Sequence, residues 1–414
     1  MKKIILLSLF LLNTFLLKSN NSILRDGNWL KIGITESGVY KIDLEFFKIH
    51  NLDAPNIDPS KIQIFGSGYN GPLPQLNSKS NLFQPVEIQS SFIGDDDNNL
   101  DNGEYLFFYL QSSNSFFYDS INNIMSSNKN IYSDTAYYLL TYNSQENKSI
   151  NNNYNATNYD SISSHGNHFY HYENDRYSII QSGREWFGKI FSSGDSQNIN
   201  LFEIKDNSQI DLEISLVSRS TVESSFDLFF NDKNISSVEM GLIKEKIYGE
   251  KFKRVVENQS FNANNNNNNN ITLSYQGLGS AISYLDYIKL NTEIPLIYDK
   301  EQIKFYVKPG YESKKIRYNI SSSQDIKVLD VTDPYSIYEH EVTKLDESDY
   351  YFLSNNERYQ NKIIFQPNLL KYPDFYNIIS NSNILDHNNP DLLIITSKDF
   401  LTQAMRIKYL RESK

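Results

Sequence analysis

The densest group of oxygen ligands in the sequence lies between residues 95 and 104. Acidic or amide side chains stand at alternate positions there: Asp95, Asp97, Asn99 and Asp101. They could converge on a hard cation such as Ca²⁺ if the loop curls. The EF-hand pattern is not met, because Leu100 takes the place of the turn glycine and Leu106 that of the bidentate glutamate. Two interpretations therefore stay open, a structural Ca²⁺ site, which would be the only cofactor, and a solvated acidic turn between two strands.

Three histidines spaced by three residues, His165, His168 and His171, form the second group. Imidazole is the commonest transition-metal ligand in proteins, but a spacing of three on a strand distributes the rings over both faces. The neighbouring Gly166 and Phe169 do not favour the helix that convergence would need. We therefore expect surface or pocket histidines rather than a metal site.

Other catalytic patterns are missing. The sequence has no Gly-x-Ser-x-Gly elbow, no phosphate-binding loop and no complete dinucleotide fingerprint. It contains no cysteine, which excludes disulfides, thiolate metal ligands and thiol nucleophiles supplied by these 414 residues. The net charge of −11 repels phosphate backbones, so we expect no nucleic-acid partner.

The first residues have the build of a secretory signal. Two lysines precede an apolar run from Ile4 to Leu17, which is shorter than the roughly 20 residues of a membrane-spanning helix. We assign residues 1–19 to a signal peptide and expect export; an N-terminal anchor or a buried first element is the alternative. No later segment approaches spanning length, so no transmembrane helix is expected beyond the signal segment.

The next part, residues 20–150, is predicted to be a β-rich domain. Residues 28–34 and 39–42 resemble two strands of a hairpin around the turn at 35–38, and Asp43 can cap a short helix. Further strands are predicted at 61–65, 104–109 and 136–142, where aromatic and branched residues fit a pleated surface.

A polar stretch at 144–163 marks a linker, and residues 164–295 then predict a β-sandwich domain. Apolar residues alternate with polar ones over 210–216, and strand-like runs follow at 226–230, 271–275 and 284–290. The asparagine run at 264–270 is expected to be a loop. Residues 296–385 are assigned to a small β module with strands near 303–307, 326–331 and 363–365.

The last stretch, residues 386–414, changes character. An apolar run at 391–396 resembles a buried parallel strand, and apolar residues then recur at helical spacing from Phe400 to Leu410. This order predicts the opening of an α/β domain, which the chain would leave incomplete.

Several segments, taken in order, resemble the N-terminal region of the gingipain-type sortases of the type IX secretion system. They are residues 29–32 with 38–42, 64–68 with Leu73-Pro74, 95–109, 132–138, 172–175 with 182–188, 330–334 and 390–396. The run Ser182-Gly183-Arg184-Glu185-Trp186-Phe187-Gly188 is the most specific piece.

The resemblance implies an exported cysteine peptidase and transpeptidase at the outer membrane or cell surface of a Gram-negative bacterium of the Bacteroidetes type. Its partners would be cargo proteins with C-terminal sorting signals and other components of the secretion system. A His and a Cys in a caspase-like α/β domain do the chemistry in that family. Neither catalytic position exists in this sequence, so no catalytic residue is assigned. The alternative function is a non-catalytic cell-surface binding or adhesion protein built on a β-sandwich.

The implied fold is mainly β: tandem β-sandwich-like domains followed by the first βα unit of a truncated caspase-like α/β peptidase domain. Within the resembling segments, we expect Trp186 and Phe187 to pack in a core or between domains, with Arg184 and Glu185 as a local ion pair. Residues 330–334 are expected to be a strand followed by a turn at Pro334.

Overall fold

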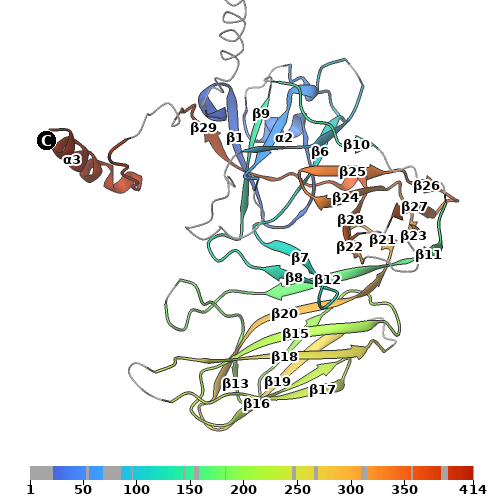
Figure 1. Ribbon diagram of the computed structural model, residues 1–414, viewed down its shortest axis with the longest axis vertical. Helices are drawn as coiled ribbons and strands as arrows, with labels where there is room; N and C mark the ends of the chain where they lie inside the picture. Colours follow the sequence, from blue (N-terminus) through green and yellow to red (C-terminus); the bar gives the residue numbers. More distant parts are fainter. Residues whose placement is uncertain are drawn as a thin grey trace, which may run out of the picture. The chain divides into compact units, whose positions relative to one another are not determined.

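The computed structural model describes residues 22–52, 56–68, 85–95, 97–142, 145–152, 158–181, 183–244, 249–264, 269–308, 315–355, 358–383 and 390–413. The protein is mainly β, as predicted, and its strands form several sheets (Figure 1). The predicted signal peptide, Leu73-Pro74 and most of the asparagine run lie outside the described residues. Among the helices that are described, none is long and apolar enough to cross a membrane.

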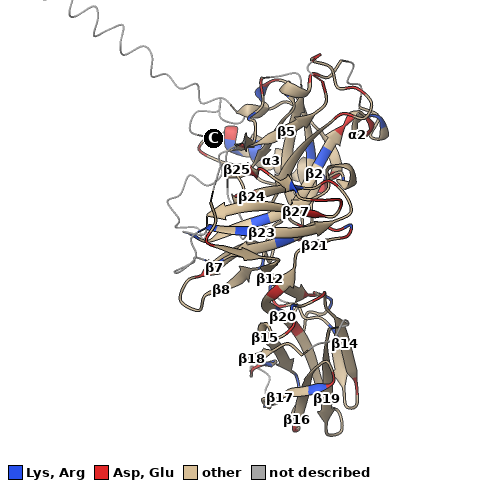
Figure 2. Ribbon diagram, turned by 90° about the vertical axis from the view of Figure 1, so that its right-hand side faces the viewer, with Lys and Arg blue, Asp and Glu red and all other residues tan. Residues whose placement is uncertain are grey.

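Two compact units divide the chain: residues 31–377 form one, and the two terminal stretches, up to residue 30 and from residue 378, form the other. In the larger unit, acidic and basic segments are interspersed along the ribbon rather than gathered by sign (Figure 2). The four-part domain division made from the sequence stays a prediction.

The N-terminal strands are distributed over two sheets. One has the order β29 (Asp374–Ile379), β1 (Asn28–Ile34), β9 (Ala136–Tyr142), β3 (Gln63–Gly66), β4 (Val86–Ile88), and the other β2 (Gly38–Asp43), β6 (Tyr105–Leu110), β5 (Ser90–Ile93). The predicted hairpin of residues 28–42 is wrong, because β2 pairs with β6 along its whole length instead of with β1. All six residues of β6 are buried, so β2 gains a fully buried partner there.

The predicted cap of the first helix is confirmed. Asp43 Oδ1 accepts a hydrogen bond from Phe46 N at 3.0 Å at the start of α2 (Leu44–Ile49). This bond satisfies one of the free N–H groups that begin every helix, and it fixes Phe46 and Phe47 in the core.

The largest sheet runs through most of the chain. Its order is β10 (Asn151–Asn152), β25 (Ser336–His340), β24 (Lys327–Asp333), β28 (Gln360–Phe365), β22 (Ile303–Val307), β12 (His165–Glu173), β20 (Ile282–Pro295), β15 (Gln209–Ser218), β18 (Lys253–Asn262), with β13 (Ile190–Ser192) also on β20. The predicted strand and turn at residues 330–334 are confirmed, since β24 ends at Asp333 and β25 starts at Ser336.

A second sheet covers one end of the largest sheet and makes a sandwich (Figure 1). Its order is β14 (Ser196–Asn200), β19 (Asn270–Gly277), β16 (Ser224–Phe230), β17 (Lys233–Glu239). The turn between β16 and β17 has positive φ at Asn231 (47°) and Asp232 (66°), the conformation that tight hairpins favour and that these residue types tolerate. Apolar residues of β15 and β20 face those of β16 and β19 in one fully buried core.

Two smaller sheets complete the larger unit. One has the order β11 (Ser161–Ser163), β23 (Lys315–Ser322), β27 (Asp349–Asn355), β26 (Thr343–Lys344), with β21 (Ile297–Tyr298) on β23; the other is the hairpin of β7 (Ser115–Asp119) and β8 (Ile124–Asn128). Short 3-10 turns lie at Ile23–Arg25, Pro59–Lys61, Pro367–Leu369 and Lys398–Phe400.

At the C-terminal end the helical half of the predicted βα unit is present as α3 (Leu401–Glu412). The apolar run at residues 391–396 is not a strand: it belongs to none of the sheets in the described part of the chain, and Leu393 and Ile395 are exposed. A strand exists only when its N–H and C=O groups pair with a neighbour, and none of the described segments pairs with this one.

Candidate functional site

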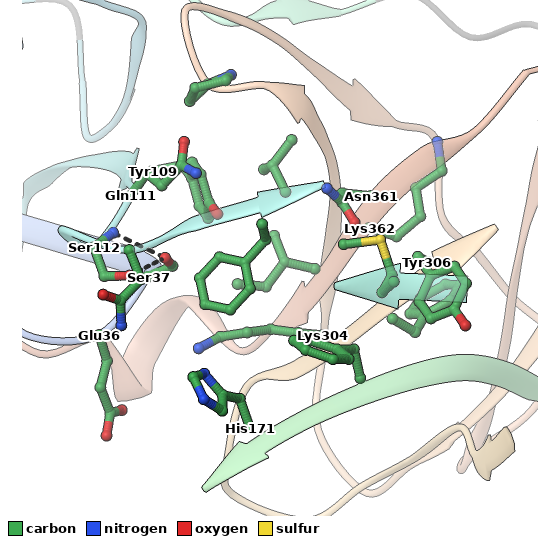
Figure 3. Close-up of a pocket in the computed structure, with 18 of the residues that line it drawn as sticks. Glu36, Ser37, Tyr109, Gln111, Ser112, His171, Lys304, Tyr306, Asn361 and Lys362 are labelled. Atoms are coloured by element: carbon green, nitrogen blue, oxygen red, sulfur yellow. Dashed lines mark hydrogen bonds between the residues drawn. The ribbon is translucent and has the colours of Figure 1, made fainter. Parts of the chain in front are cut away.

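A cavity of about 590 Å³ lies in the larger unit, where the β7–β8 hairpin meets β12, β22 and β28. We call it the hairpin cavity. Figure 3 shows Lys304 and His171 on one side and Tyr109, Gln111 and Ser112 on the other. The Ser112 N–H donates to Ser37 Oγ at 2.8 Å, which fixes the turn before β2 against the end of β6. The volume is in the range of small-ligand pockets.

Aromatic and polar groups are mixed in the lining of the hairpin cavity. Burial raises the pKa of Tyr109 to about 12 and lowers the pKa of His168, so both are neutral at pH 7. His168 Nδ1 lies 2.7 Å from the Lys304 carbonyl oxygen, which identifies Nδ1 as the protonated nitrogen. The cavity can therefore donate and accept hydrogen bonds beside aromatic rings.

A second cavity, of about 550 Å³, lies beyond the end of β8, and half of the residues that line it are charged. We call it the charged cavity. Arg254 bridges two acids: one of its terminal nitrogens lies 2.7 Å from Glu185 Oε2, and its Nε lies 3.1 Å from Asp286 Oδ2. Lys129 likewise pairs with Glu173 and Asp175.

The neighbours of the two buried acids in this cavity separate their pKa values. It raises the pKa of Asp286 to about 6, despite the hydrogen bond from Ser215 and the nearby Arg254. Burial would also raise the pKa of Glu173, but His171 and Lys129 together outweigh it and hold that pKa below its usual range.

The three histidines do not form a metal site. They all lie on β12, and His168 contacts Phe202 on the sandwich side, whereas His171 contacts Ser127 of the hairpin. Within the described ranges, no three His, Asp or Glu side chains are grouped so that they could hold a metal ion.

The structure does bring a serine, a histidine and a carboxylate together. His171 lies between Ser127 Oγ, 3.2 Å from Nδ1, and Glu173 Oε2, 3.1 Å from Nε2. Sequence reasoning missed this group because Ser127 comes from a hairpin 44 residues earlier. Nε2 makes no well-aligned hydrogen bond, and Glu173 is shared with Lys129, so the arrangement is typical of a structural network.

The acidic loop is ordered around Glu104. Its two carboxylate oxygens accept hydrogen bonds from Asp95 N at 2.8 Å and from Asp101 N at 2.9 Å. Asn99 N donates to Asp97 Oδ1 at 2.8 Å, and Asn99 Nδ2 to Asp101 Oδ1 at 2.9 Å. The nearby Asp97 raises the pKa of Asp95. The described carboxylates of this loop are not grouped to hold a metal ion as they stand. Calcium binding by Asp95, Asp97, Asn99 and Asp101 therefore stays a prediction, and it requires the loop to rearrange.

The most specific resembling segment lines the charged cavity. Phe187 is fully buried against Val217 and Tyr284, as expected. Trp186 is not in a core, since it is 41% exposed at the cavity wall. Glu185 pairs with Arg254, a residue 69 positions further along the chain. Ser182 lies outside the described residues.

A buried group of three titratable residues was not predicted from the sequence. Lys362 Nζ lies 2.9 Å from Asp330 Oδ2 and 2.8 Å from His340 Nε2, and the Lys362 side chain is 0% exposed. The three come from β28, β24 and β25, so only the strand pairing reveals the group. Asp330 and Pro334 belong to one of the segments that resemble the sortase family. No sequence pattern identified Lys362 or His340 as members of a site.

The comparisons with known proteins support a fold assignment. No protein-family model and no curated protein matches the sequence. The solved structure of dimeric latent PorU from Porphyromonas gingivalis matches with a TM-score of 0.78 and 19% identity, over 96% of this chain and 37% of that one. A carbohydrate-binding module domain of a xylanase from the hindgut metagenome of Trinervitermes trinervoides reaches a TM-score of only 0.21, with 14% identity, over 30% of this chain and 95% of that one.

The match with PorU extends over both the N-terminal sheets and the sandwich, because it covers nearly the whole chain. This chain spans only about a third of the length of that protein. The protein therefore has a PorU-like, β-rich fold.

Proposed function

We propose that this chain is the N-terminal scaffold region of a type IX secretion sortase, a gingipain-like cysteine peptidase that removes the C-terminal sorting signals of secreted cargo. The observation that carries the proposal is the fold similarity to PorU over 96% of the chain. The resembling sequence segments support it independently, since they occur in the same order.

The scaffold role follows from the residues present. Thiolate chemistry requires a cysteine, and this chain has none, so the peptidase nucleophile would come from residues outside this sequence. The chain itself would support and orient the peptidase domain. Its partners would be cargo proteins with C-terminal sorting signals and other type IX components, at the outer membrane or cell surface.

An in-frame deletion of the codons for residues 31–377 in the bacterium that carries the gene tests this function. We expect secreted cargo to keep its C-terminal signal, which mass spectrometry of surface and culture fractions would detect. Normal cargo processing in the deletion strain would contradict the proposal. If that strain instead loses only attachment to a surface or partner, the alternative of a non-catalytic adhesion protein gains support.

We also predict that the purified chain alone cleaves no cargo C-terminal peptide. The physical reason is the missing thiol nucleophile, and the measurement is the release of a fluorescent peptide with and without a thiol inhibitor. Cleavage that the inhibitor abolishes would come from a contaminating cysteine peptidase, because the chain has no thiol. Cleavage that persists with the inhibitor and follows the chain through purification would contradict this prediction.

A further inference from the structure

The buried group around Lys362 has the arrangement required for a covalent cross-link. Lys362 and Asp330 face each other directly across the antiparallel strands β28 and β24. Their side chains are in contact, with 2.9 Å between Nζ and Oδ2, and exposures of 0% and 11%. An amine and a carboxyl group are thus held together where water scarcely reaches.

Apolar residues pack beside this pair. Val328 and Ile364, the next inward residues on the same two strands, are fully buried, and the ring of Phe352 lies 4.9 Å from that of His340. Separated charges are costly in such an environment, because neither ion keeps its hydration shell. A neutral product that keeps the same hydrogen bonds would remove this cost.

Two further groups are placed to assist. Thr332 donates its backbone N–H, at 3.0 Å, and its hydroxyl to Asp330 Oδ1, the oxygen that does not face the lysine. These donors can stabilise negative charge on Oδ1. His340 Nε2 accepts from the Lys362 ammonium, which has no acceptor of its own, so Nε2 is unprotonated and can take a proton from the amine.

We propose that the folded chain joins Lys362 Nζ to Asp330 Cγ in an isopeptide bond, without a cofactor. First, the ammonium passes one proton to Asp330 Oδ2, which gives a neutral amine and a carboxylic acid. The nitrogen lone pair then attacks Cγ while His340 Nε2 takes a second proton from nitrogen, and the C=O electron pair moves to Oδ1 between the Thr332 donors.

The intermediate then collapses. The electron pair on Oδ1 reforms the carbonyl group, the C–Oδ2 bond breaks, and Oδ2 leaves as water with the proton returned from His340. One hydrogen stays on nitrogen, so the balance is ammonium plus carboxylate giving amide plus one water. In the product, the amide N–H donates to His340 Nε2 and the new carbonyl oxygen accepts from Thr332, so every group stays paired.

This bond would supply what the sequence otherwise lacks. The chain has no cysteine and therefore no disulfide, and β24 and β28 are neighbouring strands of the largest sheet. A covalent link across their centre would resist separation of these strands even when the surrounding sheet opens locally. The proposal is independent of the sortase function.

Intact-mass measurement of the purified full chain, denatured before analysis, tests the proposal. We expect a mass about 18 Da below the calculated value, the mass of one water. Trypsin should then release residues 328–344 joined to residues 359–371, because an amidated Lys362 is no longer a cleavage site. The proposal would be overturned if the protein has its full calculated mass and trypsin releases a free 359–362 peptide. Lys362 and Asp330 would then form only an ion pair.

The matched control is Lys362→Arg, which keeps the positive charge but has no amine that can form this amide. We expect its mass to equal its own calculated value and its 328–344 peptide to be unlinked. His340→Gln tests the proton acceptor: we expect a mixture of linked and unlinked chains that shifts towards the linked form over time. If the measured mass differs from the calculated mass by the same amount in the wild type and in Lys362→Arg, the proposal is again overturned. This comparison holds even if the variants fold poorly.

Discussion

Asp286 is the residue whose environment most clearly predicts a pH effect. Its side chain is only 6% exposed, and burial raises its pKa from 3.8 to about 6. Between these two values the folded state holds a proton that the unfolded state has released, so the stability falls as the pH rises. Two pKa units correspond to about 3 kcal/mol.

We therefore predict that Asp286→Asn removes this loss. From about pH 4 to about pH 7, the free energy of unfolding of the wild type should fall by about 3 kcal/mol relative to that of the variant. Urea unfolding followed by fluorescence at several pH values measures the difference. Asp206→Asn is the control, because Asp206 is exposed. Parallel curves of stability against pH for the wild type and Asp286→Asn would contradict the assignment.

The residue-scale features of the structure differ in whether the sequence could predict them. The Asp43 cap needs only contacts within one turn, so its pattern is visible in the sequence. The groups around His171 and Lys362 each combine residues from separate strands. Ser127 and His171 are 44 residues apart, and Asp330 and Lys362 are 32 residues apart. No local sequence pattern predicts contacts between residues so far apart in the chain.

The β7–β8 hairpin lines the hairpin cavity, and the side-chain amide of Asn291 is one of the groups that attach it to the large sheet. Asn291 Oδ1 accepts from Met125 N at 2.9 Å, and Asn291 Nδ2 donates to Met125 O at 3.0 Å. The side chain thus substitutes for a neighbouring strand. Tyr306 also donates its hydroxyl to Asn291 Oδ1, at 3.1 Å.

We predict that Asn291→Leu destabilises the protein by about 2–4 kcal/mol, because it removes the two hydrogen bonds between the Asn291 side chain and the buried backbone of Met125. Hydrogen exchange should accelerate over residues 115–128 more than elsewhere. Asn258→Leu, at an exposed position of β18, is the matched control and should leave both quantities nearly unchanged. Unaltered exchange in the hairpin of Asn291→Leu would show that other contacts hold it.

The acidic loop between β5 and β6 allows a test of the calcium prediction. Asp97 raises the pKa of Asp95, and a bound cation would relieve this repulsion. We predict that Ca²⁺ raises the melting temperature by a few degrees, that EDTA reverses the rise, and that Asp97→Asn abolishes it. Asp346→Asn, in another exposed turn, should respond like the wild type. If neither Ca²⁺ nor EDTA changes the melting temperature, the solvated turn is the correct interpretation.

At the scale of the whole molecule, the sequence predicted the strands better than their pairing. The strand at residues 136–142 has the predicted bounds, and residues 28–34 form a strand as expected. The partner of β2 was predicted wrongly, because alternation and turn residues identify an element but not the surface that buries it. The exposed run at 391–396 makes the same point, since its apolar composition alone creates no strand.

The hydrophobic cores indicate which parts of the chain depend on each other. The sandwich core draws all its buried residues from positions 191–290. Another core mixes the two ends of the larger unit: Phe107 and Tyr109 pack with Ile363 and Phe365, and the rings of Phe107 and Phe365 are 5.4 Å apart. The predicted N-terminal domain and the small β module thus share buried surface.

We therefore predict opposite behaviour for two fragments. Residues 164–295 contain both layers of the sandwich and should fold alone, with one cooperative thermal transition. Residues 20–150 should not, because separation from residues 296–377 exposes the aromatic face of β6. Circular dichroism and one-dimensional NMR of each fragment measure this, and adding residues 296–377 through a flexible linker should restore dispersed spectra to the second one. A cooperatively folded 20–150 fragment would show that the shared core is an interface between stable domains rather than a single folding unit.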